Sequence, residues 1–190
     1  MSDVQGHRRS IRLPGRDYSW PDTYFITICT AERKPLLGRI ENGAMRQNVL
    51  GRLVRTNWMK IPREFAVVEL DTFVVMPNHV HGIIQLHRRV APDEPQYRLA
   101  QFAKPQLASI SWIVRAFKAT VTREARQILR RPKLAVWQRN YFERIVRDTH
   151  EYKEIHRYIQ DNPKNWDQDK DNLAHNHNPN LWGTIHRAPL

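Results

Sequence analysis

The sequence predicts one α+β domain, in which an antiparallel sheet carries helices on one face. Two observations support this fold class. The apolar patterns follow the order strand, helix, strand, strand, helix, strand, helix, which is like the split βαβ arrangement. The chain has 190 residues, which is enough for one domain with its own core and short for two.

Residues 1–22 predict a basic arm rather than a strand or helix. Four arginines, Arg8, Arg9, Arg12 and Arg16, lie among Gly, Pro and Ser without any regular period. The first three are called the arm arginines below. We expect such a segment to order only on contact with a partner. The stretch "TYFITICT", residues 23–30, follows. It contains β-branched and aromatic residues throughout and predicts the first strand.

The next pattern predicts an amphipathic helix over residues 45–61. Met45, Val49, Trp58 and Ile61 recur near helical spacing, and Pro62 follows, so the helix should end there. Two apolar runs, 66–75 and 79–86, then have strand composition. The residues between them include a Pro-Asn pair, which predicts a tight turn and therefore a hairpin.

The second half of the chain predicts a further helix, strand and helix. After a proline-rich loop over 90–105, residues 107–130 carry an apolar stripe that runs from Leu107 to Ile128 and ends before Pro132. Residues 135–146 predict a fourth strand, and residues 149–162 a last helix that ends at Pro163. Residues 167–190 are rich in Asn and His and predict an irregular tail.

The composition indicates a polyanionic partner. Lys and Arg number 31 against 19 Asp and Glu, giving a formal charge of +12. A nucleic-acid backbone is the commonest partner of such a protein, although a basic soluble protein or a membrane-surface binder has the same composition. The single cysteine, Cys29, excludes an intramolecular disulfide. No apolar run is long enough for a membrane span, and we expect a cytoplasmic protein.

The segment "MPNHVHGII" contains a candidate metal site. Alternate side chains of a strand share a face, so His79 and His81 should point the same way. Two neighbouring imidazoles suit a divalent ion, although a strand histidine is also common as a hydrogen-bonded structural residue. A metal needs at least a third protein ligand, and a catalytic metal also needs open positions.

The last predicted helix offers an oxygen ligand and a nucleophile. Tyr158 and Asn162 lie four residues apart, on one helical face. The amide oxygen of Asn162 suits a hard ion such as Mg²⁺, and the phenol of Tyr158 could act as a nucleophile if its environment activates it. Two other tyrosines compete: Tyr152, which has His156 four residues on, and Tyr141, which lies in a predicted strand where its ring could equally pack.

A second His-x-His sequence, His175 and His177 in "AHNHNPN", lies where no strand pattern fixes the two rings on one face. We interpret it as part of the solvated tail or as a DNA contact.

Three blocks together resemble the single-tyrosine HUH transposases, in which an apolar residue separates two histidines. These blocks are "VVMPNHVHGII", "VWQRNYFERIVRD" and "IHRYIQDNPKNW". The N-terminal "RRSIRLPGRDYSWPDTYFITICT" resembles the branch called REP-associated tyrosine transposases. The resemblance runs with gaps from about residue 8 to residue 166, and it divides the chain into a basic arm (1–22), an HUH domain (23–166) and a tail (167–190).

The resemblance implies a ferredoxin-like domain that cuts and rejoins single-stranded DNA at hairpins, as a monomer or homodimer. By this likeness His79, His81 and Asn162 are ligands of Mg²⁺ or Mn²⁺, and Tyr158 is the nucleophile that forms a 5′-phosphotyrosine. No nucleotide cofactor is implied. The tyrosine helix could complete its own site or that of a partner subunit.

A single-stranded substrate also accounts for the basic residues of the second half. Residues 115–139 contain eight basic side chains and one acidic side chain, enough to follow a nucleic-acid backbone. We expect the DNA contacts to include the arm arginines and the following residues of this interval: Arg115, Lys118, Arg123, Arg126, Trp137 and Arg139. Trp137 could stack on a base or pack in the core.

Two other functions fit part of the pattern. A non-catalytic binder of hairpin DNA or RNA with an RRM-like fold would explain the charge and the sheet, but it would leave the His pair and the Tyr–Asn pair unexplained. A metal-dependent hydrolase would use water as its nucleophile and needs a general base, for which Glu154 or Asp161 is available. Only a tyrosine nucleophile predicts a covalent protein–DNA adduct.

Overall fold

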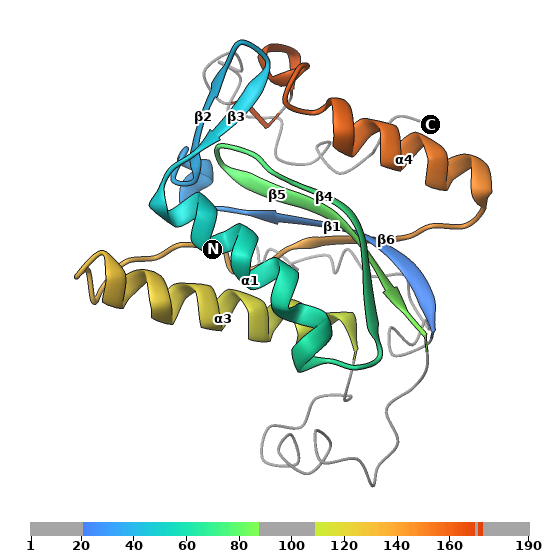
Figure 1. Ribbon diagram of the computed structural model, residues 1–190, viewed down its shortest axis with the longest axis horizontal. Coiled ribbons are helices and arrows are strands. Elements are labelled where there is room, and N and C mark those ends of the chain that lie inside the picture. Colours follow the sequence, from blue (N-terminus) through green and yellow to red (C-terminus); the bar gives the residue numbers. More distant parts are fainter. Residues whose placement is uncertain (1–20, 88–108, 170, 173–190) are drawn as a thin grey trace, which may run out of the picture.

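The computed structural model describes residues 21–87, 109–169 and 171–172, and its centre is a four-stranded antiparallel sheet (Figure 1). The strands are β1 (Asp22–Cys29), β4 (Val68–Val75), β5 (His79–Leu86) and β6 (Phe142–Ile145), and their order across the sheet is β4-β5-β1-β6. α1 (Val49–Glu64) separates β1 from β4 in the chain, and α3 (Ile110–Ile128) separates β5 from β6. This is a ferredoxin-like arrangement, and the predicted fold class is confirmed.

Different helices cover the two faces of the sheet. Ile26 and Ile28 of β1 are fully buried on the face that α1 and α3 cover. Phe25 and Ile83 point to the opposite face, where Ile159 of α4 (Thr149–Asp161) packs against them. Figure 1 shows α4 on the side of the sheet away from α1 and α3. Of the α-helices that the structure describes, α4 is therefore the one that covers this face of the sheet.

One glycine of β5 allows α1 to approach the sheet closely. A Cβ atom at Gly82 would lie 2.4 Å from Cζ2 of Trp58, closer than two carbon atoms can pack. The ring of Trp58 is fully buried over this position and stacks on Phe73 at 5.8 Å. The glycine that follows His81 is therefore explained by core packing on the far face of the strand.

The structure corrects the start of the first predicted helix. Residues 38–47 form a two-stranded ribbon, β2 (Gly38–Glu41) and β3 (Ala44–Gln47), which the sequence analysis missed. Met45 therefore lies in β3, and α1 begins only at Val49. Asn48 is its N-cap, because the Asn48 side chain accepts a hydrogen bond of 2.9 Å from the Gly51 N–H.

Three other element boundaries differ from the prediction. α1 passes Pro62 and ends at Glu64, because a proline in the last turn has a helical φ and removes only one hydrogen bond. α3 ends at Ile128, which is 55% exposed rather than part of the buried stripe. The fourth strand is shorter than predicted, since Trp137 makes only an isolated bridge to Thr30 before β6.

Two short 3₁₀ helices complete the described structure, η1 (Ala31–Arg33) and η3 (Trp166–Gln168). Beyond η3, Asp171 and Asn172 are buried, so the packed structure continues past residue 166, where the predicted domain ends. The predicted loop over 90–105 lies outside the described residues. Among the helices that the structure describes, none combines the length and the apolar character that crossing a membrane requires.

Candidate active site

Two buried histidines of β5 form the centre of the candidate site. His79 and His81 alternate with Val80 along the strand, so both rings lie on the face that α4 covers. Their ring centroids are 4.3 Å apart. His79 is fully buried and His81 is 3% exposed. The two imidazoles are therefore close enough to act on one ligand.

Asn78 sets the orientation of the His79 ring. The Asn78 Nδ2 donates hydrogen bonds to the backbone oxygens of Arg33 (3.1 Å) and Asp171 (2.7 Å). Its Oδ1 therefore faces Nδ1 of His79 at 2.8 Å and accepts a hydrogen bond from the N–H there. Nε2 of His79 is left buried without a hydrogen-bond partner. Burial also lowers the pKa of His79 to about 4, so the ring is neutral near pH 7 and its Nε2 lone pair is available.

His81 is held in a similar way. Its Nδ1 lies 2.9 Å from Oγ1 of Thr27 on the neighbouring strand β1, and Phe25 stacks on the ring with a centroid distance of 5.4 Å. The Nε2 of His81 lies 3.2 Å from the hydroxyl oxygen of Tyr158. A metal-binding histidine usually has a hydrogen-bond partner on one ring nitrogen, as Thr27 provides here, and directs its other nitrogen into the site.

Asp171 and Asn162, from the C-terminal part of the described chain, add oxygen atoms to the candidate site of His79 and His81. Asp171 is buried, and one of its carboxylate oxygens lies within 4.8 Å of a ring nitrogen of each of His79 and His81. The same carboxylate forms a buried ion pair with Arg33. Asn162, the C-cap of α4, donates from Nδ2 to Asp169 at 2.9 Å, and its Oδ1 is buried without a hydrogen-bond partner.

Tyr158 lies beside the histidines on α4. Its hydroxyl faces His81, and its ring packs edge-on against Phe25 with a centroid distance of 6.3 Å. Burial raises the pKa of Tyr158, Asp169 raises it further, and a hydrogen bond with Asn162 opposes the shift. The phenol is therefore protonated near pH 7 in the free protein.

The two competing tyrosines are engaged elsewhere. The Tyr152 hydroxyl donates to Oδ2 of Asp71 at 2.5 Å, and this hydrogen bond, together with burial, raises the pKa of Tyr152 to about 12. The Tyr141 hydroxyl donates to Glu143, and its ring packs with the core on the α1 and α3 side. Of the three tyrosines, Tyr158 is the one whose hydroxyl contacts the histidine pair.

Local interactions at the start of α4 fix the position of this helix. Asp148 is its N-cap and accepts a hydrogen bond of 2.8 Å from the Glu151 N–H. The Glu151 carboxylate forms ion pairs with Arg147 and with Arg144 of β6. The helix is thus tied to the sheet within its first turn.

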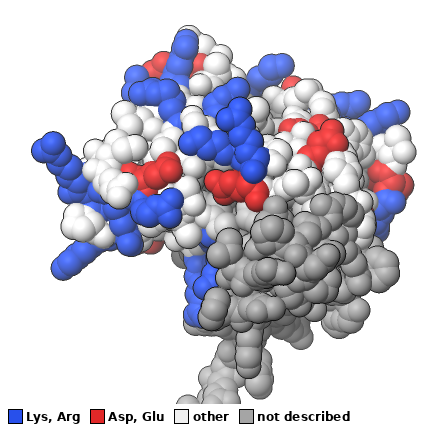
Figure 2. Space-filling view, turned by 60° about the horizontal axis from the view of Figure 1, so that its bottom comes forward, with Lys and Arg blue, Asp and Glu red and all other residues white. Residues whose placement is uncertain are grey.

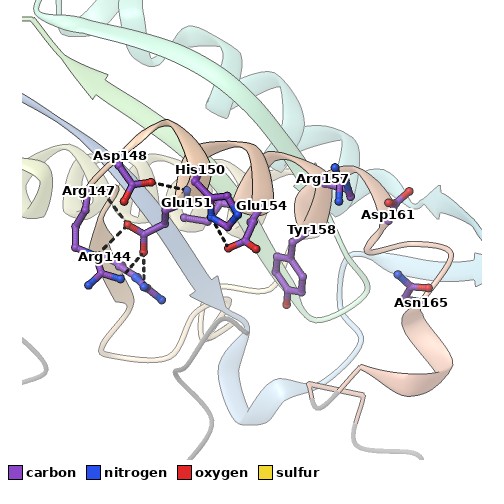
Figure 3. Close-up of a pocket in the computed structure, with 11 residues that line it drawn as sticks. Arg144, Arg147, Asp148, His150, Glu151, Glu154, Arg157, Tyr158, Asp161 and Asn165 are labelled. Carbon is purple, nitrogen blue, oxygen red and sulfur yellow. Dashed lines mark hydrogen bonds and ion pairs between the residues drawn. The ribbon is translucent and has the colours of Figure 1, made fainter. Parts of the chain in front are cut away.

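A groove runs along α4 and includes Tyr158 in its wall (Figure 3). Its volume is about 450 Å³. The Glu151 ion pairs lie at one end, and Asp161 and Asn165 lie at the other. Its lining combines basic and acidic side chains, among them Arg157 and Glu154.

The residues predicted to bind DNA separate into two groups. Five line a second groove, of about 750 Å³, between α3 and the segment that follows it: Lys118, Arg123, Arg126, Trp137 and Arg139. This lining contains no acidic side chain. Arg115 is exposed on α3 outside the groove. Figure 2 shows lysine and arginine side chains spread over this side of the molecule, with smaller acidic groups between them.

Two members of the second groove also have structural contacts. The Lys118 Nζ donates to the backbone oxygens of Gln138 (2.7 Å) and Arg139 (3.0 Å), and burial lowers the pKa of Lys118 to about 8. Trp137 is half-buried, with its ring 5.8 Å from that of Phe117. The arm arginines and the pair His175 and His177 lie outside the described residues.

Sequence reasoning missed Asn78, Thr27 and Asp171. Asn78 directly precedes His79, and the Pro-Asn pair by itself predicts only a turn residue there. Thr27 is a polar side chain in an otherwise apolar strand, and this feature of the sequence indicates that it has a buried hydrogen-bond partner. Asp171 lies in a segment expected to be irregular, and no local pattern marks it.

Comparison with known proteins gives a sequence relative and a solved structure of similar fold. No protein-family model matches the chain. A protein of Haemophilus influenzae, described as uncharacterized, is 45% identical over 168 residues, which cover 86% of this chain and 92% of that protein. A solved structure of a REP-associated tyrosine transposase bound to a REP hairpin has a TM-score of 0.54 and 22% identity, over 80% of this chain and 72% of that one. This similarity shows the shared fold.

Proposed function

We propose that this chain, which belongs to one family with the Haemophilus influenzae protein, is a metal-dependent transposase-like enzyme that cleaves and rejoins single-stranded DNA at hairpins. The observation that carries the proposal is the contact between the Tyr158 hydroxyl and the pair His79 and His81. A tyrosine hydroxyl lies 3.2 Å from Nε2 of His81, beside a His79 Nε2 that is buried without a hydrogen-bond partner. Non-catalytic binding does not require this arrangement.

The residues present fit a divalent cation, Mg²⁺ or Mn²⁺. The Nε2 atoms of His79 and His81 would bind it, together with an oxygen of Asp171, of Asn162 or of both. The unpartnered Nε2 of His79 and Oδ1 of Asn162 support this, because buried polar atoms normally have partners. When bound, the ion would polarise the scissile phosphate and stabilise the charge that develops on its oxygens.

Tyr158 would supply the nucleophile. Its hydroxyl oxygen forms a bond to phosphorus, the bond from phosphorus to the 3′ oxygen breaks, and the products are a 5′-phosphotyrosine and a free 3′-hydroxyl. Because the pKa of Tyr158 is raised in the free protein, its proton must leave as the bond to phosphorus forms. Attack of a 3′-hydroxyl on the phosphotyrosine reverses the step and joins two strands without hydrolysis.

The second groove would hold the DNA that flanks the cleaved bond. The segment that lines it pairs with the end of β1: the Gln138 N–H donates to the Cys29 oxygen at 3.0 Å, and Cys29 pairs with His79 across the sheet. One strand, β1, therefore lies between this segment and β5, and α3 lines the groove on the face of the sheet opposite α4. The similar transposase structure contains a REP hairpin, and hairpin DNA is the partner that we propose here. The arm arginines would add backbone or groove contacts.

A cleavage assay tests the proposal. The chain is incubated with Mg²⁺ and single-stranded oligonucleotides that carry palindromes from the source genome, and the products are separated on a denaturing gel. We expect cleavage by the unaltered chain and none by His81→Ala. His87→Ala is the matched control, because His87 directly follows the same strand, is exposed, and pairs through its side chain with Glu69. Absence of cleavage with every oligonucleotide, or full Mg²⁺-dependent cleavage by His81→Ala, would overturn the proposal.

A further inference from the structure

A bulge in β4 places a carboxylate against the tyrosine helix. Across from Ile83 of β5, the edge strand β4 has two residues, Asp71 and Thr72, because the pairing shifts between Leu70 and Phe73. A bulge of this kind re-aims a side chain. The Thr72 N–H donates to Oδ1 of Asp71 at 2.6 Å, so the bulge itself fixes the carboxylate.

The carboxylate binds α4 through Tyr152. The Tyr152 hydroxyl donates to Oδ2 of Asp71 at 2.5 Å, and Gln85 of β5 reaches the same oxygen at 3.4 Å. His156, one turn further along α4, approaches the other carboxylate oxygen to 4.0 Å. Since α4 is tied to β6 through Glu151, the bond to Asp71 is a second attachment, on the opposite edge of the sheet.

We infer that Asp71 and Tyr152 are positioning residues for the nucleophile: they fix the tilt of α4 over the sheet and thereby hold the Tyr158 hydroxyl beside His81. The inference rests on the proposed function. Tyr158 lies seven residues beyond Glu151, about 10 Å along the helix axis, so a tilt of about 6° around the Glu151 attachment moves its hydroxyl by about 1 Å. A displacement of this size is enough to reduce a rate by as much as about 100-fold.

Tyr152→Phe is the direct test, because it removes one oxygen atom and keeps the ring. The measurement is the single-turnover rate of adduct formation at saturating oligonucleotide, together with the DNA dissociation constant. We expect the rate to fall by about 10- to 100-fold with the dissociation constant unchanged. Asp71→Asn keeps an acceptor for Tyr152, so its rate should lie between those of the unaltered chain and Asp71→Ala. The double variant Asp71→Ala/Tyr152→Phe should be no slower than the slower single variant.

Tyr141→Phe is a matched control. It removes the same kind of bond, a tyrosine hydroxyl donating to a carboxylate at 2.5 Å, on the face of the sheet that α4 does not cover. Its thermal stability should fall, but its cleavage rate at saturating DNA should not. Hydrogen exchange gives a readout independent of cleavage: in Tyr152→Phe the α4 amides should exchange faster while those of α1 keep their rates.

The outcomes separate this inference from the proposed function. If the unaltered chain forms no adduct, the proposed function fails. If it forms an adduct and Tyr152→Phe reacts at the same rate, or slows no more than Tyr141→Phe, the positioning role is wrong and the proposed function stands. A loss confined to DNA affinity would also overturn the positioning role.

Discussion

Replacement of Asn78 by alanine tests whether the histidine pair is prepared for a metal. The Asn78 side chain is buried and makes three hydrogen bonds, to the ring of His79 and to the backbone oxygens of Arg33 and Asp171. Without it, the His79 ring can rotate or shift its proton to Nε2, which removes the free lone pair. The metal site should therefore weaken although no proposed ligand has been changed.

The expected magnitudes follow from these contacts. Each buried polar group left unpaired costs about 1–3 kcal/mol, so we expect a loss of about 2–5 kcal/mol in the free energy of unfolding, with water replacing part of the bonds. Loss of an outer-shell partner weakens metal binding about 10- to 100-fold. At a metal concentration 100 times the dissociation constant of the unaltered chain, bound metal adds about 2.7 kcal/mol of stability, which should fall to about 0.4–1.4 kcal/mol in the variant.

The assay is urea denaturation with and without Mn²⁺, supported by titration calorimetry. Asn57→Ala is the matched control: Asn57 is also buried and donates to Leu53 and Glu124, but it lies on α1, on the other face of the sheet. Asn57→Ala should lose stability and keep its full stabilisation by Mn²⁺. If Asn78→Ala binds Mn²⁺ as tightly as the control does, Asn78 does not orient a metal ligand and the reasoning is refuted.

Three further predictions concern the same site and the DNA surface. The buried His79 has a pKa of about 4 in the folded chain and about 6.5 in the unfolded chain. As the pH falls from 6.5 to 4 the unfolded chain takes up this proton first, so up to about 3 kcal/mol of stability is lost. His79→Gln should lack this loss in denaturation experiments, and the same dependence of stability on pH in that variant would contradict the role given to His79. Asp171→Asn should weaken Mn²⁺ binding more than Asn162→Ala, because it removes a charged ligand; calorimetry giving the reverse order would make Asn162 the main oxygen ligand. Replacing the arm arginines with alanine should reduce the slope of log affinity against log salt by about 2–3, and an identical slope in a filter-binding titration would exclude the arm from DNA contact.

Most of the fold was predictable because the spacing of apolar residues within each helix or strand can be read from the local sequence. β1, β5 and α3 each carry the apolar pattern of their element, and the turn between β4 and β5 contains Pro77 and Asn78 as expected. The β2–β3 ribbon was not predicted because its strands are short and polar. Its Asn42-Gly43 pair, with φ of 52° and 69°, is nevertheless a hairpin signal that the sequence contained.

The sequence could predict the site only for residues whose spacing within one strand or one helix puts their side chains on a common face. The common face of His79 and His81 follows from alternation along β5, and Tyr158 and Asn162 share a face of α4 by their spacing. The approach of Asp171 depends on the path of the chain after η3, which no local pattern specifies. The contact between Asp71 and Tyr152 likewise joins residues 81 positions apart, so it required the packed structure.

The central claim is that Tyr158 attacks the DNA, and peptide mapping of the covalent adduct tests it most directly. The chain is incubated with Mg²⁺ and a cleaved oligonucleotide, digested with protease and nuclease, and analysed by mass spectrometry. The account predicts a nucleotide phosphate on the peptide that contains Tyr158, and no adduct with Tyr158→Phe. Because Phe keeps the ring that packs on Phe25, folding and DNA binding of this variant should be retained. An adduct on Tyr152 or any other residue, or cleavage by Tyr158→Phe at the rate of the unaltered chain, would contradict the account.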